Sequence, residues 1–400
     1  MGLSNVKIKK YDLLYAGLQG SYWAYYASVW EFIAIILGFY GFSGKAIGTL
    51  TALATLLSVV VQPILATYAD RSERFRSREM VMVLMAITLL VALTLCFVPV
   101  THALRALLFW MMGLLLSCIS PFLNSLATDL MARGENLNYG FGRGFGSLCY
   151  AITVMIVGSF VGERDPRLSL TVFIFILSLA FLIILACRLP DGVEKNTEVQ
   201  KALGTIEFLK ANPKFIAALL GAAFFSAGHG IYNTYYYAVI DRAALTGTLV
   251  MGMTLGIEAI IEMPAMSLFP ALRRRISCET LLVFAGIGIC VKAILYICCT
   301  SEVMLYINAV LQFFENGFYI TTAVYLAKEY IAEADQSKGQ GLMYAAGGGL
   351  GCAMGNFCGG FLLDHFSIVA SLLFSALCGL LSALCFFVCK RNRKAGMTRA

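Results

Sequence analysis

The sequence predicts an all-α integral membrane protein whose twelve transmembrane helices form two bundles of six. Three observations support this prediction: the composition, twelve long apolar stretches, and a polar segment that divides them into equal sets. Hydrophobic residues make up 60% of the 400 residues and charged residues only 13%, and the mean hydropathy is +0.80. Soluble domains carry about 25% charged residues, so this chain has too little polar surface to cover a water-soluble body.

Each apolar stretch is long enough to cross a bilayer, which takes about 20 helical residues. The stretches lie near residues 13–40, 46–68, 80–100, 103–131, 140–161, 168–187, 215–239, 247–270, 280–299, 303–327, 340–363 and 367–389. The first is too long for the apolar part of a cleavable signal, so we expect it to remain as a span. We expect an N-terminal bundle over 1–187, a cytoplasmic linker over 188–214, and a C-terminal bundle with a short basic tail over 215–400.

The distribution of basic residues predicts the orientation. Twelve spans place both termini on the same side of the membrane, and the segments on that side hold 23 of the 30 Lys and Arg residues. The opposite loops hold five, namely Lys45, Arg105, Arg164, Arg167 and Arg242. Because cytoplasmic loops are enriched in Lys and Arg, we expect both termini in the cytoplasm and the chain in the cell (inner) membrane.

The eleventh stretch carries glycines at four-residue spacing, at Gly347, Gly351, Gly355 and Gly359. Such a stripe lets two helices approach closely. Two interpretations stay open, ordinary tight packing or the close packing of helices that must slide when the bundles rock.

Six ionisable residues lie within or at the mouth of the predicted spans, where each charge costs at least about 2.5–3.5 kcal/mol. They are Glu31, Arg143, Glu258, Glu262, Lys292 and Glu315. A structural ion pair is the alternative for any one of them. Burial disfavours a charged carboxylate and a nearby cation favours it, so an excess of acids beside a lysine is typical of a proton relay. Glu258 and Glu262 are four residues apart, so we expect one of them to be neutral or paired with lysine.

Other polar residues share helix faces with these charges. Asn308, Gln312, Glu315 and Tyr319 fall on one face of the tenth span, and Arg143, Ser147 and Tyr150 on one face of the fifth. Further candidates are Asn124, His229 and Asn233, although His229 alone is more often a helix-contact residue. Polar and aromatic groups around one cavity suit a hydroxyl-rich solute, which needs hydrogen bonds and a flat apolar surface.

The sequence contains no phosphate-binding loop, no His/Glu metal spacing and no catalytic triad, and it has only three histidines. We therefore expect no enzyme activity, no metal, no cofactor and no nucleic-acid partner, and transport driven by a gradient.

Four segments resemble the major facilitator superfamily, in particular its lactose-permease-like branch of oligosaccharide and nucleoside proton symporters. The most specific are the segment from Tyr139 to Tyr150, which is similar to the family's YG-x-x-R-x-x-GS pattern, and the segment from Gln312 to Phe318. The others are Gln62-Pro63 followed by Ala69-Asp70-Arg71, and Ala285-Gly286 leading to Lys292. The resemblance implies two six-helix bundles and alternating access.

The resemblance also implies roles. Arg143 would bind sugar hydroxyls, and Tyr150 would stand where an indole stacks on the sugar. Glu315 would be the proton-coupling carboxylate and Lys292 its cationic partner, with Glu262, Glu258 and Glu31 as further candidates. Asp70, with Arg71, would form a conformational gate. The sequence departs from the family at Asn124, where lactose permease has an acid, at Gln312, which replaces a histidine, and at Ala309, which replaces a lysine.

We therefore expect a secondary transporter that imports a small polar organic solute, a sugar or nucleoside-like molecule, with protons. Its partners would be that solute, protons and the lipid bilayer, and the functional unit a monomer. The alternatives are an exporter or uniporter of a more apolar molecule, a transport-inactive sensor with the same fold, and a membrane-embedded enzyme.

Overall fold

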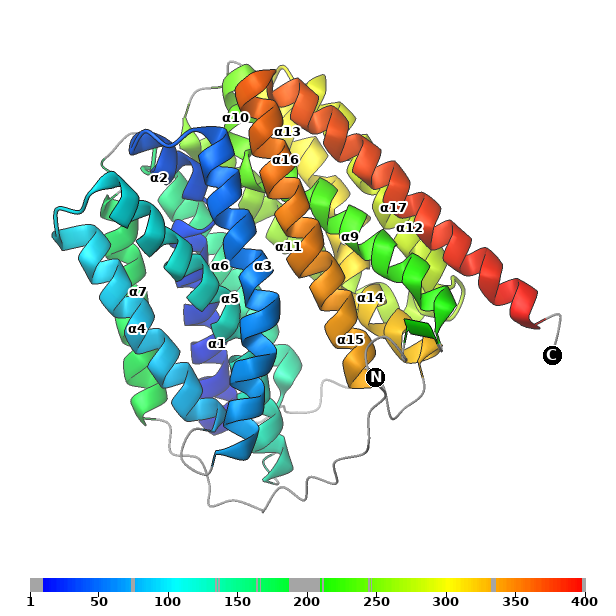
Figure 1. The fold of residues 1–400 in the computed structure, drawn as a ribbon, viewed down its shortest axis with the longest axis horizontal. Coiled ribbons are helices and arrows are strands. Elements are labelled where there is room, and N and C mark those ends of the chain that lie inside the picture. The colour runs from blue at the N-terminus through cyan, green and yellow to red at the C-terminus, as the bar shows by residue number, and fades with distance from the viewer. Residues whose placement is uncertain are drawn as a thin grey trace, which may run out of the picture.

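The computed structural model describes residues 10–72, 76–133, 135, 137–162, 165, 167–186, 209–210, 212–243, 245, 247–331 and 336–397. Within these ranges every regular element is a helix, and Figure 1 shows the helices gathered in two groups. The predicted all-helical architecture is confirmed. Most of the predicted linker over 188–214 lies outside the described residues, so the boundaries of the two bundles stay a prediction.

The described part of the first half contains seven helical segments. They are α1 (Lys10–Val29), α2 (Ile33–Phe39), α3 (Gly44–Arg71), α4 (Ser77–Phe97), α5 (His102–Ala132), α6 (Tyr139–Gly158) and α7 (Arg167–Ala186). Within this half α1 packs on α6 and α7, and α4 packs on α5 and α7.

The second half is more interrupted. Its segments are α9 (Pro213–Thr234), α10 (Tyr236–Arg242), α11 (Thr248–Arg273), α12 (Cys278–Ile297), α13 (Glu302–Val310), the 3-10 turn η1 (Leu311–Phe313), α14 (Asn316–Tyr330), α15 (Gln336–Tyr344), the π-helical segment η3 (Ala345–Gly351), α16 (Cys352–His365) and α17 (Ile368–Met397). Here α17 packs on α12 and α9, and α16 packs on α9.

Ten helices in the described part of the chain are long and apolar enough to cross a membrane. The two remaining predicted spans, 303–327 and 340–363, are present but interrupted. The first comprises α13, η1 and α14, with Glu315 in a non-helical conformation (φ −85°, ψ −94°) immediately before α14. The second widens into η3 over its glycine-rich run.

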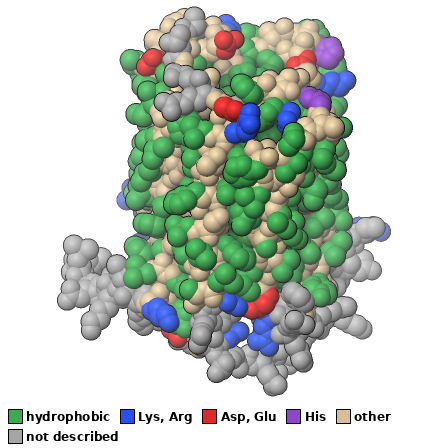
Figure 2. Space-filling view, turned by 90° about the vertical axis from the view of Figure 1, so that its left-hand side faces the viewer, with side chains coloured by type: hydrophobic (Ala, Val, Ile, Leu, Met, Phe, Trp, Pro, Cys, Tyr) green, Lys and Arg blue, Asp and Glu red, His purple; other side chains and the backbone are tan. Residues whose placement is uncertain are grey.

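The outer surface of the helices is apolar. Figure 2 shows hydrophobic side chains covering the middle of the visible face, with charged side chains gathered toward its two ends. Leucines such as Leu90 on α4, Leu182 on α7 and Leu384 on α17 are more than half exposed. Exposing so much apolar surface to water is unfavourable, whereas lipid accommodates it. The chain is a multi-pass integral membrane protein.

The two halves contact each other mainly through two helix pairs, α3 with α16 and α6 with α11. At the start of α3, the Asp364 carboxylate accepts hydrogen bonds from the backbone N–H groups of Gly44 (2.8 Å) and Lys45 (2.6 Å). One turn further, a Cβ at Gly48 would overlap the carbonyl oxygen of Asn356. The bundles therefore pack closely at the end of the molecule where α3 begins.

The glycine stripe of the eleventh span packs within its own half. A Cβ at Gly351 or Gly355 would overlap the backbone of Ala223 or Ala227, both on α9. The close approach of two helices predicted from the stripe is confirmed. The inter-bundle contact on this helix instead uses the neighbouring face, at Asn356 and Gly360, which approach α3.

Candidate functional site

A cavity of about 200 Å³ lies between the two halves. Its lining comes from both: Trp23, Tyr26, Glu31, Arg143, Ser147 and Tyr150 from the first, and His229, Asn233, Leu255, Glu258, Ala259, Glu262, Gln312, Asn316 and Ile320 from the second. Pockets for drug-sized ligands span about 300–1,000 Å³, so this cavity suits a smaller molecule. Nine residues proposed from the sequence meet here: Glu31, Arg143, Ser147, Tyr150, His229, Asn233, Glu258, Glu262 and Gln312.

Arg143 forms the polar part of the wall from the first half. A Cβ at Gly146 would lie 2.7 Å from the Trp23 ring, so this glycine lets α6 pack closely on α1. The Arg143 guanidinium lies over the Trp23 ring, 4.4 Å from its centroid, and donates one hydrogen bond to Ser147 Oγ (3.2 Å). Ser147 is one helical turn from Arg143, which explains the contact. A guanidinium has five N–H donors, so donors remain to bind a solute in the cavity.

Glu31 lies in the turn between α1 and α2, where the first span is interrupted. Its Oε2 accepts a hydrogen bond from Nδ2 of Asn233 (3.4 Å), the second-to-last residue of α9. This contact joins the two halves across the cavity. Both residues therefore sit beside interruptions of their helices, since α9 gives way to α10 at Tyr235.

Glu262 is held by two neutral amides. Its Oε1 accepts hydrogen bonds from Gln312 Nε2 (2.7 Å) and Asn316 Nδ2 (2.6 Å). A carboxylate has about four lone-pair sites, so acceptor capacity remains for hydroxyl groups in the cavity.

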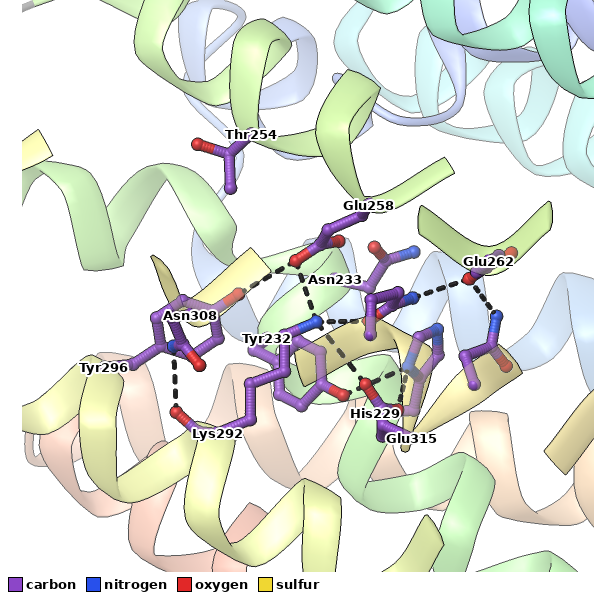
Figure 3. A network of polar contacts seen from close by, with 12 residues as sticks. His229, Tyr232, Asn233, Thr254, Glu258, Glu262, Lys292, Tyr296, Asn308 and Glu315 are labelled. Carbon is purple, nitrogen blue, oxygen red and sulfur yellow. Dashed lines mark hydrogen bonds and ion pairs between the residues drawn. The ribbon is translucent and has the colours of Figure 1, made fainter. Parts of the chain in front are cut away.

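A buried ion cluster lies behind this wall (Figure 3). Lys292 Nζ is 2.7 Å from Glu258 Oε1 and 3.4 Å from Glu315 Oε2, and it also donates to Gln312 Oε1. The side chains of Lys292 and Glu315 are 0% exposed. Tyr296 donates a further hydrogen bond to Glu258 (3.1 Å). The expectation that one of the pair Glu258 and Glu262 binds a lysine is confirmed, as is the contact between Lys292 and Glu315.

His229 joins this cluster to the cavity. Its Nδ1 lies 2.7 Å from Glu315 Oε1 and 3.1 Å from the Tyr232 hydroxyl. Figure 3 shows these two contacts as dashed lines from the imidazole to Glu315 and to the Tyr232 hydroxyl. The sequence placed His229 among the solute-binding residues; the structure adds the contact with Glu315.

Some candidates lie elsewhere. Asn124 is not in the cavity lining; it accepts hydrogen bonds from Gln19 Nε2 (3.3 Å) and Tyr139 (3.2 Å) inside the first half. Asp70 and Arg71 end α3, and their side chains are outside the described part of the structure.

Tyr319 is the last of the four residues predicted to share one face of the tenth span. It stacks on Phe225 of α9, with ring centroids 3.7 Å apart, and Phe225 is one turn from the His229 that contacts Glu315. Asn308, the first member, donates to the backbone oxygen of Lys292 (3.1 Å).

Sequence reasoning missed four polar or aromatic residues around the site. Trp23, Tyr26 and Asn316 line the cavity, and Tyr232 contacts His229. A signal existed for two of them, since Trp23 and Tyr26 are three residues apart on the helix that leads to Glu31.

Membrane-spanning helices in two groups that enclose a polar cavity, with buried charges beside it, define a membrane transporter. The chain matches the MFS_1 like family over residues 15–374, and it belongs to that family of major facilitator transporters. Members of this superfamily move small molecules across membranes and are not enzymes.

Two curated relatives match over most of the chain. The maltose permease of Geobacillus stearothermophilus is 29% identical over 367 residues, which cover 88% of each protein. The uncharacterized transporter YwbF of Bacillus subtilis (strain 168) is 24% identical over 375 residues, covering 92% of this chain and 90% of the relative.

Solved structures share the fold. The nucleoside transporter NupG superposes with a TM-score of 0.80 at 15% identity, covering 96% of this chain and 99% of that one. A bacterial homologue of the lysosomal transporter Spinster, in an inward-facing and unoccupied conformation, gives 0.71 at 13% identity, covering 97% and 98%.

Proposed function

We propose that this transporter imports a small polar organic solute, a sugar or a nucleoside-like molecule, together with protons. One observation carries the proposal: a cavity rich in hydrogen-bonding groups adjoins a buried cluster of two carboxylates, a lysine and a histidine. The first part supplies solute recognition, and the second supplies a group that can gain and lose a proton.

The cavity lining favours a hydroxyl-rich solute. Leu255, Ala259 and Ile320 are the aliphatic residues among the fifteen that line it. Arg143 offers donors and Glu262 offers acceptors, while Trp23 and Tyr150 offer aromatic surface. This composition disfavours the alternative of an exporter or uniporter for a more apolar molecule. The names of the maltose permease and the nucleoside transporter NupG point to the same class of solutes.

Glu315 is the proposed proton-coupling residue, with Lys292 as its partner. A buried carboxyl is neutral unless a cation stabilises its charge, and here Lys292 is shared between Glu315 and Glu258. A movement that weakens one of these contacts would change which carboxyl holds a proton. Glu31 and Glu262 line the cavity and are further candidates.

We propose that both termini face the cytoplasm of a cell (inner) membrane protein that functions as a monomer. On this orientation the contact of Asp364 with the start of α3 would lie at the outer end of the molecule. The test is labelling of a cysteine introduced within 195–205. An impermeant reagent added to intact cells should label it only after permeabilisation, and labelling without permeabilisation would overturn the orientation.

Uptake by proteoliposomes tests the transport proposal. Purified protein should accumulate at least one member of a panel of labelled sugars, nucleosides and aromatic acids under an imposed pH gradient, acid outside. Accumulation should vanish when a protonophore collapses the gradient. Equilibration of the solute without accumulation at any pH gradient would refute coupling to protons.

A further inference from the structure

We propose that His229 is the proton relay between the water-accessible cavity and Glu315, a role distinct from binding the solute. This inference rests on the proposed proton coupling at Glu315. The Glu315 carboxylate has no direct access to the cavity.

Glu315 is enclosed. Its side chain is 0% exposed, and it is absent from the residues that line the cavity. Behind it, α12 approaches so closely that a Cβ at Gly288 would lie 3.2 Å from the Glu315 Cβ and 3.3 Å from its Cα. On the other sides lie Lys292, which is fully buried, and Tyr232, which is 1% exposed.

His229 contacts both Glu315 and the cavity. Its side chain is 20% exposed and lines the cavity, while Nδ1 is 2.7 Å from Glu315 Oε1. Among the described side chains, His229, Lys292 and Tyr232 hydrogen-bond or ion-pair with the Glu315 carboxylate. Of these three, His229 is the one that also lines the cavity. Imidazole has two nitrogens that can each hold a proton, which suits it to carry protons at neutral pH.

The transfer balances in protons. Cavity water delivers a proton to Nε2 of His229, and the Nδ1–H bond breaks as its proton passes to the Glu315 carboxylate. The products are a neutral Glu315 and a neutral imidazole that holds its proton on Nε2. Release runs the same steps in reverse, with the proton leaving from Nε2.

The charges of the cluster support one mobile proton. Lys292 compensates one of the two carboxylates, Glu258 or Glu315, and the second negative charge requires one further proton, on His229 or on Glu315. Two other carboxylates line the same cavity as the imidazole, Glu31 from the turn after α1 and Glu262 from α11. Removing the imidazole should therefore slow proton movement while leaving the proton site itself in place.

The test compares His229→Asn with His365→Asn in proteoliposomes loaded with a pH dye. His365 is a matched control because it lies at the end of α16 and bonds the backbone oxygen of Phe361. In His229→Asn we expect solute-dependent proton uptake to slow at least tenfold, and by a larger factor than the exchange of labelled for unlabelled solute slows. Retained exchange also shows that the variant is folded. Imidazole added to His229→Ala should restore proton uptake.

Two outcomes would overturn the relay. One is proton uptake in His229→Asn at the wild-type rate. The other is a rise of at least tenfold in the KM of His229→Asn for the solute, with the number of protons moved per solute and the rate of proton uptake at saturating solute both unchanged. That pattern would mark His229 as a solute ligand. If the wild-type protein itself moved no protons with its solute, the proposed coupling would fail, and this result is separable because it does not involve His229.

Discussion

Replacing Glu315 with Gln should separate solute movement from proton movement. Glutamine has nearly the shape of a protonated glutamate and cannot release a proton. In the variant, Lys292 still pairs with Glu258 at 2.7 Å, so the cluster is neutral without any added proton. We therefore expect solute binding and exchange to persist and accumulation against a gradient to disappear.

The size of the effect follows from the charges of the cluster. Two carboxylates against one lysine leave one proton to be gained or lost in each cycle. A pH gradient of one unit is worth about 1.4 kcal/mol per proton, which corresponds to a tenfold solute accumulation for one proton per solute. Wild type should therefore accumulate solute about tenfold, and Glu315→Gln should reach only equal concentrations inside and outside.

The assay is uptake by proteoliposomes under a one-unit pH gradient with the membrane potential clamped at zero. Asp165→Asn provides the control, because Asp165 forms a half-exposed ion pair with Arg167 (2.9 Å) away from the cluster. This control should accumulate solute like the wild type. Tenfold accumulation by Glu315→Gln would show that the transported proton is carried elsewhere, with Glu262 and then Glu31 as the next candidates.

Three further variants test the cavity, the packing of α3 on α16 and the ion cluster. Arg143→Lys should raise the Kd of the solute at least tenfold in equilibrium binding, because a hydrogen bond to a charged group contributes about 1.5–3 kcal/mol and an ammonium lacks the planar fork of a guanidinium. Arg105→Lys, at a guanidinium 4.0 Å from the Tyr40 ring, should not raise this Kd. Unchanged binding in Arg143→Lys would make Arg143 structural. Gly48→Leu should increase the distance between spin labels placed on α3 and α16. Gly38→Leu should leave the wild-type distances, because a Cβ there meets nothing within 4 Å. No increase in Gly48→Leu would contradict the close packing. Lys292→Met should lower the free energy of unfolding in detergent by about 3–5 kcal/mol, because it leaves buried carboxylates without a compensating charge. Adding Glu258→Gln to this variant should recover part of the loss. An unchanged melting temperature in Lys292→Met would show that the cluster is not stabilising.

The spans and the charges within them could be predicted from the sequence because each depends on a local rule. An apolar run of about 20 residues is sufficient evidence for a span, and a charge within it is visible by inspection. The same reasoning brought Arg143, Ser147 and Glu262 to one cavity. Their mutual distances could not be predicted, because these depend on how α6 and α11 pack.

The interruptions of the helices could not be predicted, because proline does not cause them. Pro63 and Pro121 lie inside the continuous helices α3 and α5. The segment from Leu311 to Glu315 contains neither proline nor glycine, yet it leaves the α-helical conformation. Its side chains Gln312 and Glu315 both reach Lys292, a contact with another helix that no local propensity encodes.

Asn124 shows the limit of a family resemblance. The resemblance to lactose permease implies an acid at this position as the partner of the arginine on the next helix. Here the neutral amide of Asn124 binds Gln19 and Tyr139, and the Arg143 guanidinium lies on Trp23 instead. Arg143 therefore lines the cavity with Ser147 and Trp23 as its contacts instead of the acid that the resemblance implies.

The interruptions explain why the proposed solute and proton sites lie next to each other. Inside a bilayer, non-helical backbone is tolerated only where polar groups or a cavity satisfy it, so an interrupted helix concentrates polar groups around it. Gln312 lies in such an interruption, and its amide donates to Glu262 at the cavity while accepting from Lys292 in the buried cluster. Because one side chain makes both contacts, a solute that displaces Gln312 from Glu262 also alters the surroundings of Lys292, and through Lys292 those of Glu315.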